Sequence, residues 1–460
     1  MDTGQKKQVK ILKRGWVTFL LLVILSAEGC NTKSPENTTW LTPSTTRLQG
    51  VIPTKVEPTQ GGFRLVRGGK PYYLRGGAGV QQIDRLREAG GNTLRLWSSD
   101  FAEPFMDEAH QAGLSVMLGL WMEPETSHFT YYDPAMVEAQ LGRIRQQVLR
   151  YRHHPALLMW NVGNEVDISA RGPRLFSALG RIAHMIHELD PYHPVTTTLG
   201  DLDSRAAELH HLAPEVDILS FNIYGKLRIL PTLLRNSGWL GPYIISEYGN
   251  AGYWEEAETK WGAQLEKTST AKAVFVSSLY RQVIEPDSNK CLGSYLFFWG
   301  SKFEYTSTWF SLFEPTGEKT ALVDEMNYLW RGQYPTNRAP LITDLQLAGR
   351  RASASIEATV GQLLPSIVEA SDPEGDSLTV HWELLPEVEK TFDAKIIATP
   401  PESVENAVIS GYGFGALIKA PQLPGPYRLY VRVFDGHGSV ATANIPFWVR
   451  TVPPTLVGTR

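Results

Sequence analysis

Short apolar runs alternate with longer amphipathic stretches through the middle of the chain. NTLRLW (92–97), LSVMLGLWM (114–122) and YIISEYG (243–249) are apolar runs of strand length. Segments such as PAMVEAQLGRIRQQVLRY (134–151) instead carry apolar residues at helical spacing. Counted in this way, residues 62–335 hold eight strands with helices between most of them. This alternation predicts an α/β domain built on a parallel sheet.

The number of strand–helix units and the length of residues 62–335 predict a (β/α)8 TIM barrel. An open doubly wound sheet is the alternative fold, but the segment contains no Gly-rich dinucleotide turn to favour it. The pattern changes after Arg331. PTNRAP (335–340) is typical of a linker, and residues 340–452 carry short β-branched and aromatic runs separated by turn clusters. That spacing predicts a C-terminal all-β immunoglobulin-like sandwich.

The N-terminal region has the order of a secretory targeting segment. In residues 1–30, basic residues precede an apolar stretch that is too short to span a bilayer comfortably, and small residues follow it. SAEGC (26–30) resembles a bacterial lipoprotein box, which predicts a lipid anchor at Cys30; simple secretion and an uncleaved anchor are the alternatives. Residues 31–61 lack periodicity and are expected to be a flexible tether. We therefore expect a secreted or cell-envelope protein, membrane-anchored if Cys30 is lipidated.

Composition excludes several classes of function. The formal net charge is −4, and no basic stripe follows the targeting segment, so no nucleic-acid partner is expected. The two cysteines exclude a disulfide framework, and Cys291 is predicted to be a buried, unreactive thiol. The absence of a P-loop and of a GxSxG elbow removes support for nucleotide and serine-hydrolase chemistry. His184 and His187 fit an outer helix face better than a metal site, and no metal or cofactor is predicted.

Two of the apolar runs end in a glutamate, and these two residues carry the candidate chemistry. RHHPALLMWNVGNE (152–165) ends in Glu165, and IISEYG places Glu247 at the end of another run. In a parallel barrel the C-terminal tips of the strands meet on one face. Two carboxyl groups on that face are what cleavage of a glycosidic bond requires. Each glutamate alone is explained as a surface residue after a strand, so the inference depends on the pair.

The two motifs together resemble those of the clan A glycoside hydrolases, most closely the TIM-barrel catalytic domain of glycoside hydrolase family 2. The resemblance extends over about residues 62–335 and agrees with the barrel expected from the periodicity. It implies a retaining enzyme that acts on β-linked sugars by double displacement. In that mechanism Glu247 corresponds to the nucleophile and Glu165 to the acid/base.

Other residues at strand ends fit the same site. A cation beside Glu247 would keep it ionised, and Arg95 in NTLRLW is placed to do so. The resemblance implies an arginine there, and it implies that Tyr224 donates a hydrogen bond to the nucleophile. It also implies that Asn164 holds the sugar 2-hydroxyl and that Trp299 is the platform under the sugar. Candidates for contacts at outer positions of the substrate, each also explained by barrel packing, are Trp97, Trp121 and Trp309.

The expected function is hydrolysis of a β-linked glucan or oligosaccharide. A transglycosylase that uses the same residues is an alternative, and so is a non-catalytic carbohydrate-binding protein. Family 2 members often carry β-sandwich domains before the barrel, where this sequence predicts a tether. A cleft left open in this way favours a β-glucan or oligosaccharide over a single terminal sugar.

Overall fold

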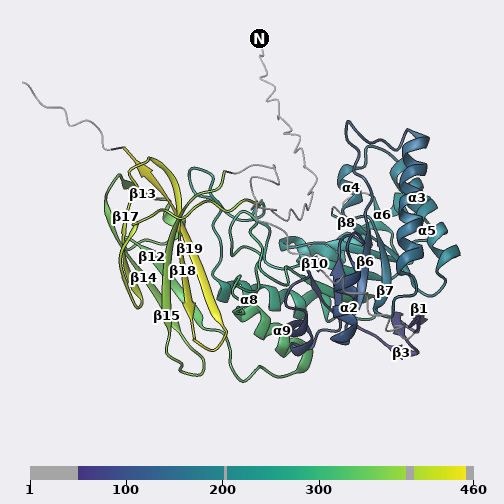
Figure 1. Ribbon diagram of the computed structural model, residues 1–460, viewed down its shortest axis with the longest axis horizontal. Coiled ribbons are helices and arrows are strands. Elements are labelled where there is room, and N and C mark those ends of the chain that lie inside the picture. The colour runs from purple at the N-terminus through teal and green to yellow at the C-terminus, as the bar shows by residue number, and fades with distance from the viewer. Residues whose placement is uncertain (1–49, 201–204, 390–397, 452–460) are drawn as a thin grey trace, which may run out of the picture.

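The computed structural model describes residues 50–200, 205–389 and 398–451 (Figure 1). The predicted targeting segment, Cys30 and most of the predicted tether lie outside the described residues. In the described part, no helix is long and apolar enough to cross a membrane.

Eight parallel strands close into a barrel. Around it they follow the order β10, β11, β4, β5, β6, β7, β8, β9, and β9 pairs again with β10. The TIM-barrel prediction is confirmed, and the doubly wound alternative is wrong. The strands are β4 (Leu74–Ala78), β5 (Thr93–Leu96), β6 (Ser115–Leu120), β7 (Leu157–Val162), β8 (Val195–Leu199), β9 (Ile218–Asn222), β10 (Tyr243–Tyr248) and β11 (Cys291–Phe297).

The barrel has two apolar layers. Side chains such as Met117, Ile218 and Ile244 fill its interior, while a second cluster joins the outer faces of the strands to the helices. Because both faces of each strand are buried, the strands appear in the sequence as continuous apolar runs. Cys291 is buried at the start of β11, and burial raises the pKa of its thiol to about 12, as expected for an unreactive cysteine.

Helices follow the strands around the outside of the barrel. The longest begins at Pro134, and the side chain of Asp133 accepts hydrogen bonds from the amides of Ala135 and Met136, which caps its first turn. The α-helices are α1 (Ile83–Glu88), α2 (Glu103–Gln111), α3 (Pro134–Tyr151), α4 (Val166–Ser169), α5 (Arg174–Leu189), α6 (Ala206–Leu212), α7 (Leu230–Ser237), α8 (Ser269–Leu279) and α9 (Ala321–Arg331). Short turns of other helix types are η1 (Gly225–Ile229), η2 (Tyr280–Ile284) and η3 (Ala352–Ala354).

A small antiparallel sheet precedes the barrel and corrects one expectation. It consists of β1 (Thr54–Thr59), β2 (Gly62–Arg67) and β3 (Lys70–Pro71). The tether prediction was wrong for residues 54–59, because this stretch pairs along its whole length with β2. Its first amide also donates to the carbonyl of Tyr192, which ties the strand to the barrel.

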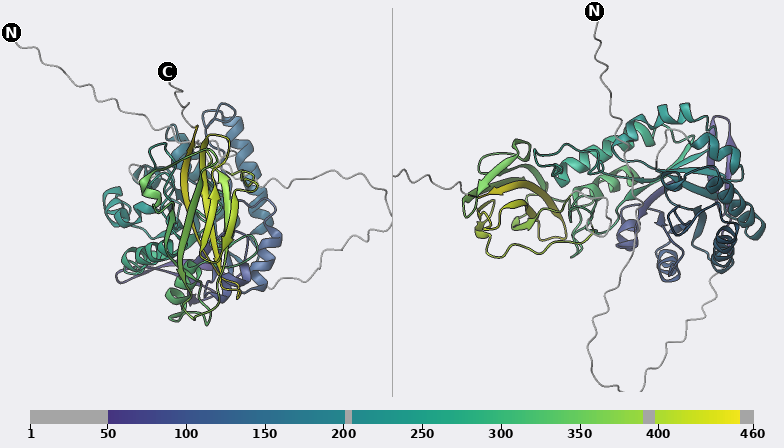
Figure 2. Two further views of the ribbon diagram at one scale, coloured as in Figure 1. Left: turned by 90° about the vertical axis from the view of Figure 1, so that its left-hand side faces the viewer. Right: turned by 90° about the horizontal axis from the view of Figure 1, so that it is seen from above.

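The C-terminal part is all β, as predicted, and forms two sheets of four strands that share one apolar core. One sheet holds β12 (Leu341–Leu347), β14 (Leu363–Ser371), β17 (Gly415–Lys419) and β16 (Val408–Tyr412). The other holds β13 (Ile356–Thr359), β19 (Val440–Arg450), β18 (Gly425–Phe434) and β15 (Thr379–Pro386). Figures 1 and 2 show this sandwich at one end of the barrel, and α8 packs against β12 and β19.

Candidate active site

Glu247 lies near the end of β10, and its carboxylate is held by donors from two neighbouring regions. Oε1 accepts from the guanidinium of Arg95 and from Nε1 of Trp97 at 2.7 Å. Oε2 accepts from the hydroxyl of Tyr224 at 2.6 Å. All three groups donate, and Arg95 is completely buried, so its charge acts on the carboxylate with little screening. The carboxylate of Glu247 is therefore fixed in place by three hydrogen bonds from three different side chains.

Glu165 follows β7 and has a different environment. Its backbone has a φ of 51°, in the left-handed region, and its Oε1 accepts from Nδ2 of Asn222 at 3.0 Å. Burial of the carboxyl, followed by the negative charge of Glu247, raises the pKa of Glu165 from 4.5 to about 7. The hydrogen bond from Asn222 and the charge of Arg95 act in the opposite direction but do not cancel these effects. A carboxyl group of this pKa carries a proton for part of the time near neutral pH.

Asn164 and Asn222 join the two carboxyl groups into one network. Oδ1 of Asn164 accepts from Arg95 at 2.7 Å and from Asn222 at 3.1 Å. The ends of β5, β7, β9 and β10 therefore meet at one face of the barrel, as the sequence predicts. A carboxylate held by three donors and a carboxyl group with a raised pKa therefore lie in one network.

Aromatic rings form a wall beside Glu247. The ring of Trp97 stacks on Phe298 with 6.2 Å between centroids and meets Phe297 edge-on at 6.0 Å. Tyr224 continues the wall through edge contacts with Phe297 and Trp254, both at 5.8 Å. Trp254 keeps 37% of its surface exposed and so offers an accessible aromatic residue beside the wall. Aromatic faces can hold the C–H faces of a sugar ring.

The prediction that Trp299 is the platform under the sugar was wrong. Its side chain is completely buried, donates to the carbonyl of Gln82 at 3.0 Å and stacks on Trp330 of α9. Phe298, the preceding residue, contacts Trp97 at the site, whereas Trp299 packs between the barrel and its helices.

The structure places the other three candidate tryptophans in different environments. Trp97 contacts Glu247 directly, which makes it part of the inner site and not the outer position that the sequence indicates. Trp309 is completely buried and donates to the carbonyl of Ala251 at 2.9 Å. Trp121 is half-buried one residue after β6. A sugar contact for Trp121 stays a prediction.

Sequence reasoning missed several residues of the site. Asn222 had a usable signal, since it is the polar end of the otherwise buried strand ILSFN. Phe297, Phe298 and Trp254 had none, because an aromatic residue near a strand end is as readily explained by packing. Among the described residues, no group of three or more His, Cys, Asp or Glu could hold a metal ion.

Residues 104–308 match the model of a family described as "Glycosyl hydrolases family 2, TIM barrel domain". The match lies within the barrel and includes its strands from β6 to β11. This confirms the resemblance that the two glutamate motifs indicate. The match ends before the sandwich and covers both Glu165 and Glu247.

Relatives of known name match parts of the chain. A beta-glucuronidase of Canis lupus familiaris is 26% identical over 236 residues, which cover 43% of this chain and 34% of the relative. Beta-galactosidase BoGH2A of Bacteroides ovatus is 25% identical over 252 residues, which cover 45% of this chain and 28% of the relative. A probable mannan endo-1,4-beta-mannosidase C of Aspergillus terreus is 28% identical over 163 residues, which cover 28% of this chain and 39% of the relative. The chain thus spans about a third of the length of these relatives.

Solved structures also align with the chain. Bacteroides uniformis beta-glucuronidase 2, covalently bound to cyclophellitol-6-carboxylate aziridine, is 17% identical with a TM-score of 0.47, and the alignment covers 87% of this chain and 48% of that one.

Proposed function

We propose that the protein is a retaining β-glycoside hydrolase with Glu247 as the nucleophile and Glu165 as the acid/base. The observation that carries the proposal is the contrast between the two carboxyl groups. The carboxylate of Glu247 accepts hydrogen bonds from three side chains, one of them a buried guanidinium, while the pKa of Glu165 is raised to about 7. Retaining cleavage requires one group of each kind.

The first step forms a covalent intermediate. Oε2 or Oε1 of Glu247 attacks the anomeric carbon, and the bond from that carbon to the leaving oxygen breaks as Glu165 gives the oxygen its proton. The negative charge of Glu247 is lost in this step, and the hydrogen bonds from Arg95, Trp97 and Tyr224 orient the carboxylate for it. Loss of that charge also lowers the pKa of Glu165, since Glu247 contributes to its elevation.

The second step releases the sugar. Glu165, now ionised, takes a proton from a water molecule, whose oxygen attacks the anomeric carbon and displaces Glu247. The starting protonation states are restored, with Glu165 protonated and Glu247 ionised. The β configuration is retained because the two displacements each invert the same carbon.

We propose a β-linked glucan or oligosaccharide as the substrate. The names of the relatives include a glucuronidase, a galactosidase and a mannosidase, all designated beta, so they support a β linkage and do not select a sugar. The exposed Trp254 and the aromatic wall beside it support a substrate that extends over several rings. The predicted lipid anchor at Cys30 and the cell-envelope location also remain proposals; incorporation of a labelled fatty acid that is lost in Cys30→Ala tests the anchor.

Product analysis tests the proposed function. The protein is incubated with a panel of β-glucans and β-linked oligosaccharides, and the products are separated by chromatography. Glu247→Gln should abolish the formation of shorter products. Glu138→Gln, which changes an exposed glutamate on α3, is the matched control and should leave them unchanged. Binding without turnover in the unaltered protein would contradict the enzymatic proposal, and products longer than the substrate would indicate a transglycosylase.

A further inference from the structure

The loop between β11 and α9 contributes one ring to the aromatic wall. The ring of Phe310 lies 5.4 Å from that of Tyr224 and 5.3 Å from that of Phe297, measured between centroids. Tyr224 in turn donates its hydroxyl to Glu247. The position of Phe310 therefore bears directly on the residue that orients the nucleophile.

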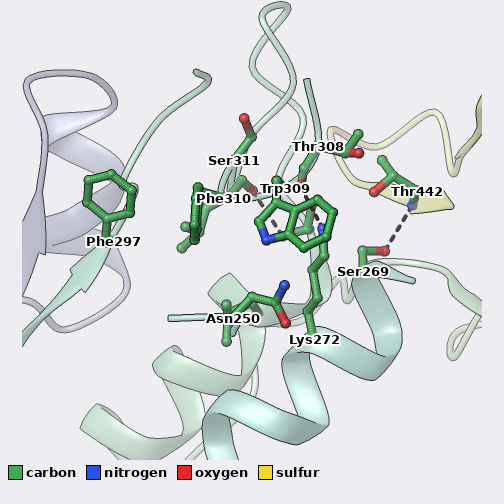
Figure 3. Close-up of a pocket in the computed structure, with 12 residues that line it drawn as sticks. Asn250, Ser269, Lys272, Phe297, Thr308, Trp309, Phe310, Ser311 and Thr442 are labelled. Atoms are coloured by element: carbon green, nitrogen blue, oxygen red, sulfur yellow. Dashed lines mark hydrogen bonds between the residues drawn. The ribbon is translucent and has the colours of Figure 1, made fainter. Parts of the chain in front are cut away.

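The backbone just before Phe310 is attached to a buried ion pair. Nζ of Lys272, on α8, donates to the carbonyl of Thr308 at 2.6 Å and pairs with Glu266. The carboxylate of Glu266 also accepts from the hydroxyls of Thr306 and Thr308, both at 2.8 Å. Figure 3 shows Lys272 pointing up from its helix to this part of the loop.

The sandwich provides a further hydrogen-bond donor to the carboxylate of Glu266. Nδ2 of Asn444, on β19, donates to Oε2 of Glu266 at 2.6 Å and lies 3.3 Å from the hydroxyl of Thr308. Oδ1 of Asn444 accepts from Arg428 of β18 at 2.7 Å. Arg428 is itself buried, paired with Glu387, and donates to the carbonyl of Gln264 at 2.9 Å. The loop, α8 and two strands of the sandwich thus share one buried polar network.

A small cavity lies beside this loop. Its lining includes Lys272, Trp309, Phe310 and Asn250 (Figure 3). Neither polar atom of the buried Asn250 side chain has a hydrogen-bond partner among the described residues. The polar network holds the loop together with the indole of Trp309 and with the carbonyl of Phe310, which accepts from the amide of Phe298 at 3.1 Å.

We propose that Asn444 is a positioning residue for the active site. Through Glu266 and Thr308 it fixes the loop so that Phe310 holds Tyr224 on Glu247. The C-terminal sandwich is therefore part of the support of the catalytic barrel and not an independent module. Removal of the Asn444 amide leaves a buried carboxylate short of a donor, and the loop shifts to recover one. Displacements of about 1 Å at such distances can lower rates up to about 100-fold.

A double-mutant cycle on the full chain tests this chain of contacts; its kinetic readout rests on the proposed function. We expect Asn444→Ala to lower kcat by about 10- to 100-fold with a smaller change in KM. Phe310→Ala should lower kcat to a similar extent. If Asn444 acts through Phe310, the double variant is no slower than Phe310→Ala alone. Effects that multiply, or an unchanged kcat in Asn444→Ala, would overturn the proposal.

Val431→Ala is the matched control for instability of the sandwich. Val431 lies on the same β18 strand as Arg428 but points into the core between the two sheets. Its truncation should lower the melting temperature of the sandwich and leave kcat unchanged. A loss of kcat equal to that in Asn444→Ala, at an equal loss of stability, would show a merely structural role.

Hydrogen–deuterium exchange separates the inference from the proposed function. In Asn444→Ala, the backbone amide hydrogens of residues 304–311 should exchange faster than in the unaltered protein. In Val431→Ala, their exchange should be unchanged. Unchanged exchange in Asn444→Ala would refute the positioning role whatever the activity. An absence of turnover in the unaltered protein would instead refute the proposed function, and the exchange result would still decide the inference.

Discussion

Replacement of Glu165 by Gln should stabilise the protein, and the gain should grow with pH. The pKa of Glu165 in the folded protein is raised from 4.5 to about 7, chiefly by burial. Between these two values the folded state binds more protons at this site than the unfolded state, so stability falls as the pH rises. At about 1.4 kcal/mol per unit, the loss approaches about 3 kcal/mol above pH 7.

Glutamine removes this loss and keeps the shape of the side chain. Its amide oxygen can still accept from Nδ2 of Asn222, as Oε1 of Glu165 does. We therefore expect no difference in the free energy of unfolding at pH 4, where the glutamate is largely protonated in both states. At pH 8 the variant should be more stable by up to about 3 kcal/mol.

Urea unfolding followed by tryptophan fluorescence at pH 4, 6 and 8 measures the difference. Glu138→Gln, which changes an exposed glutamate on α3, gives the background effect of the same chemical change. A stability gain that is the same at all three pH values would refute the reasoning. So would a gain that shrinks as the pH rises, because the raised pKa of Glu165 fixes the sign of the dependence.

Three further predictions concern activity and packing. The rate should fall as the pH rises through about 7, where Glu165 loses the proton that the leaving oxygen needs; a profile of kcat/KM that stays flat to pH 9 would contradict this assignment. Tyr224→Phe removes the 2.6 Å hydrogen bond to Glu247 and should lower kcat/KM by about 10- to 100-fold, as loss of a bond worth about 1.5–3 kcal/mol implies; unchanged kinetics would show that the bond does not matter. Trp299→Ala should lower the free energy of unfolding by about 3–5 kcal/mol in urea titrations, and a changed KM without that loss would restore the platform interpretation.

The parts of the fold that were predictable follow from burial. A barrel strand buried on both faces must be an apolar run, and a polar residue at its C-terminal end has few reasons to be there other than the site. Arg95, Glu165 and Glu247 could be placed for this reason, and the structure brings them together. The pairing of residues 54–59 with β2 could not, because TKVEPT contains a proline and only its first residue is buried.

Orientation at the ends of strands was less predictable than position. Phe297, Phe298 and Trp299 are consecutive aromatic residues, and the sequence does not say which of them faces the site. The resemblance points to Trp299, which is the one that packs against α9. The polar network of Glu266, Lys272 and Asn444 was also beyond prediction, since it joins three segments that are distant in the chain.

Trapping of the covalent intermediate tests the central claim most directly. In 2-deoxy-2-fluoro-β-glycosides the fluorine slows both displacements, while a good leaving group still allows the first one to occur. The covalent intermediate therefore accumulates when the protein is treated with a panel of such compounds. Peptide mass spectrometry of the inactivated protein should find one sugar attached to Glu247, and Glu247→Gln should remain unlabelled. A label on another residue, or turnover of the parent glycoside by Glu247→Gln at the rate of the unaltered protein, would contradict the account.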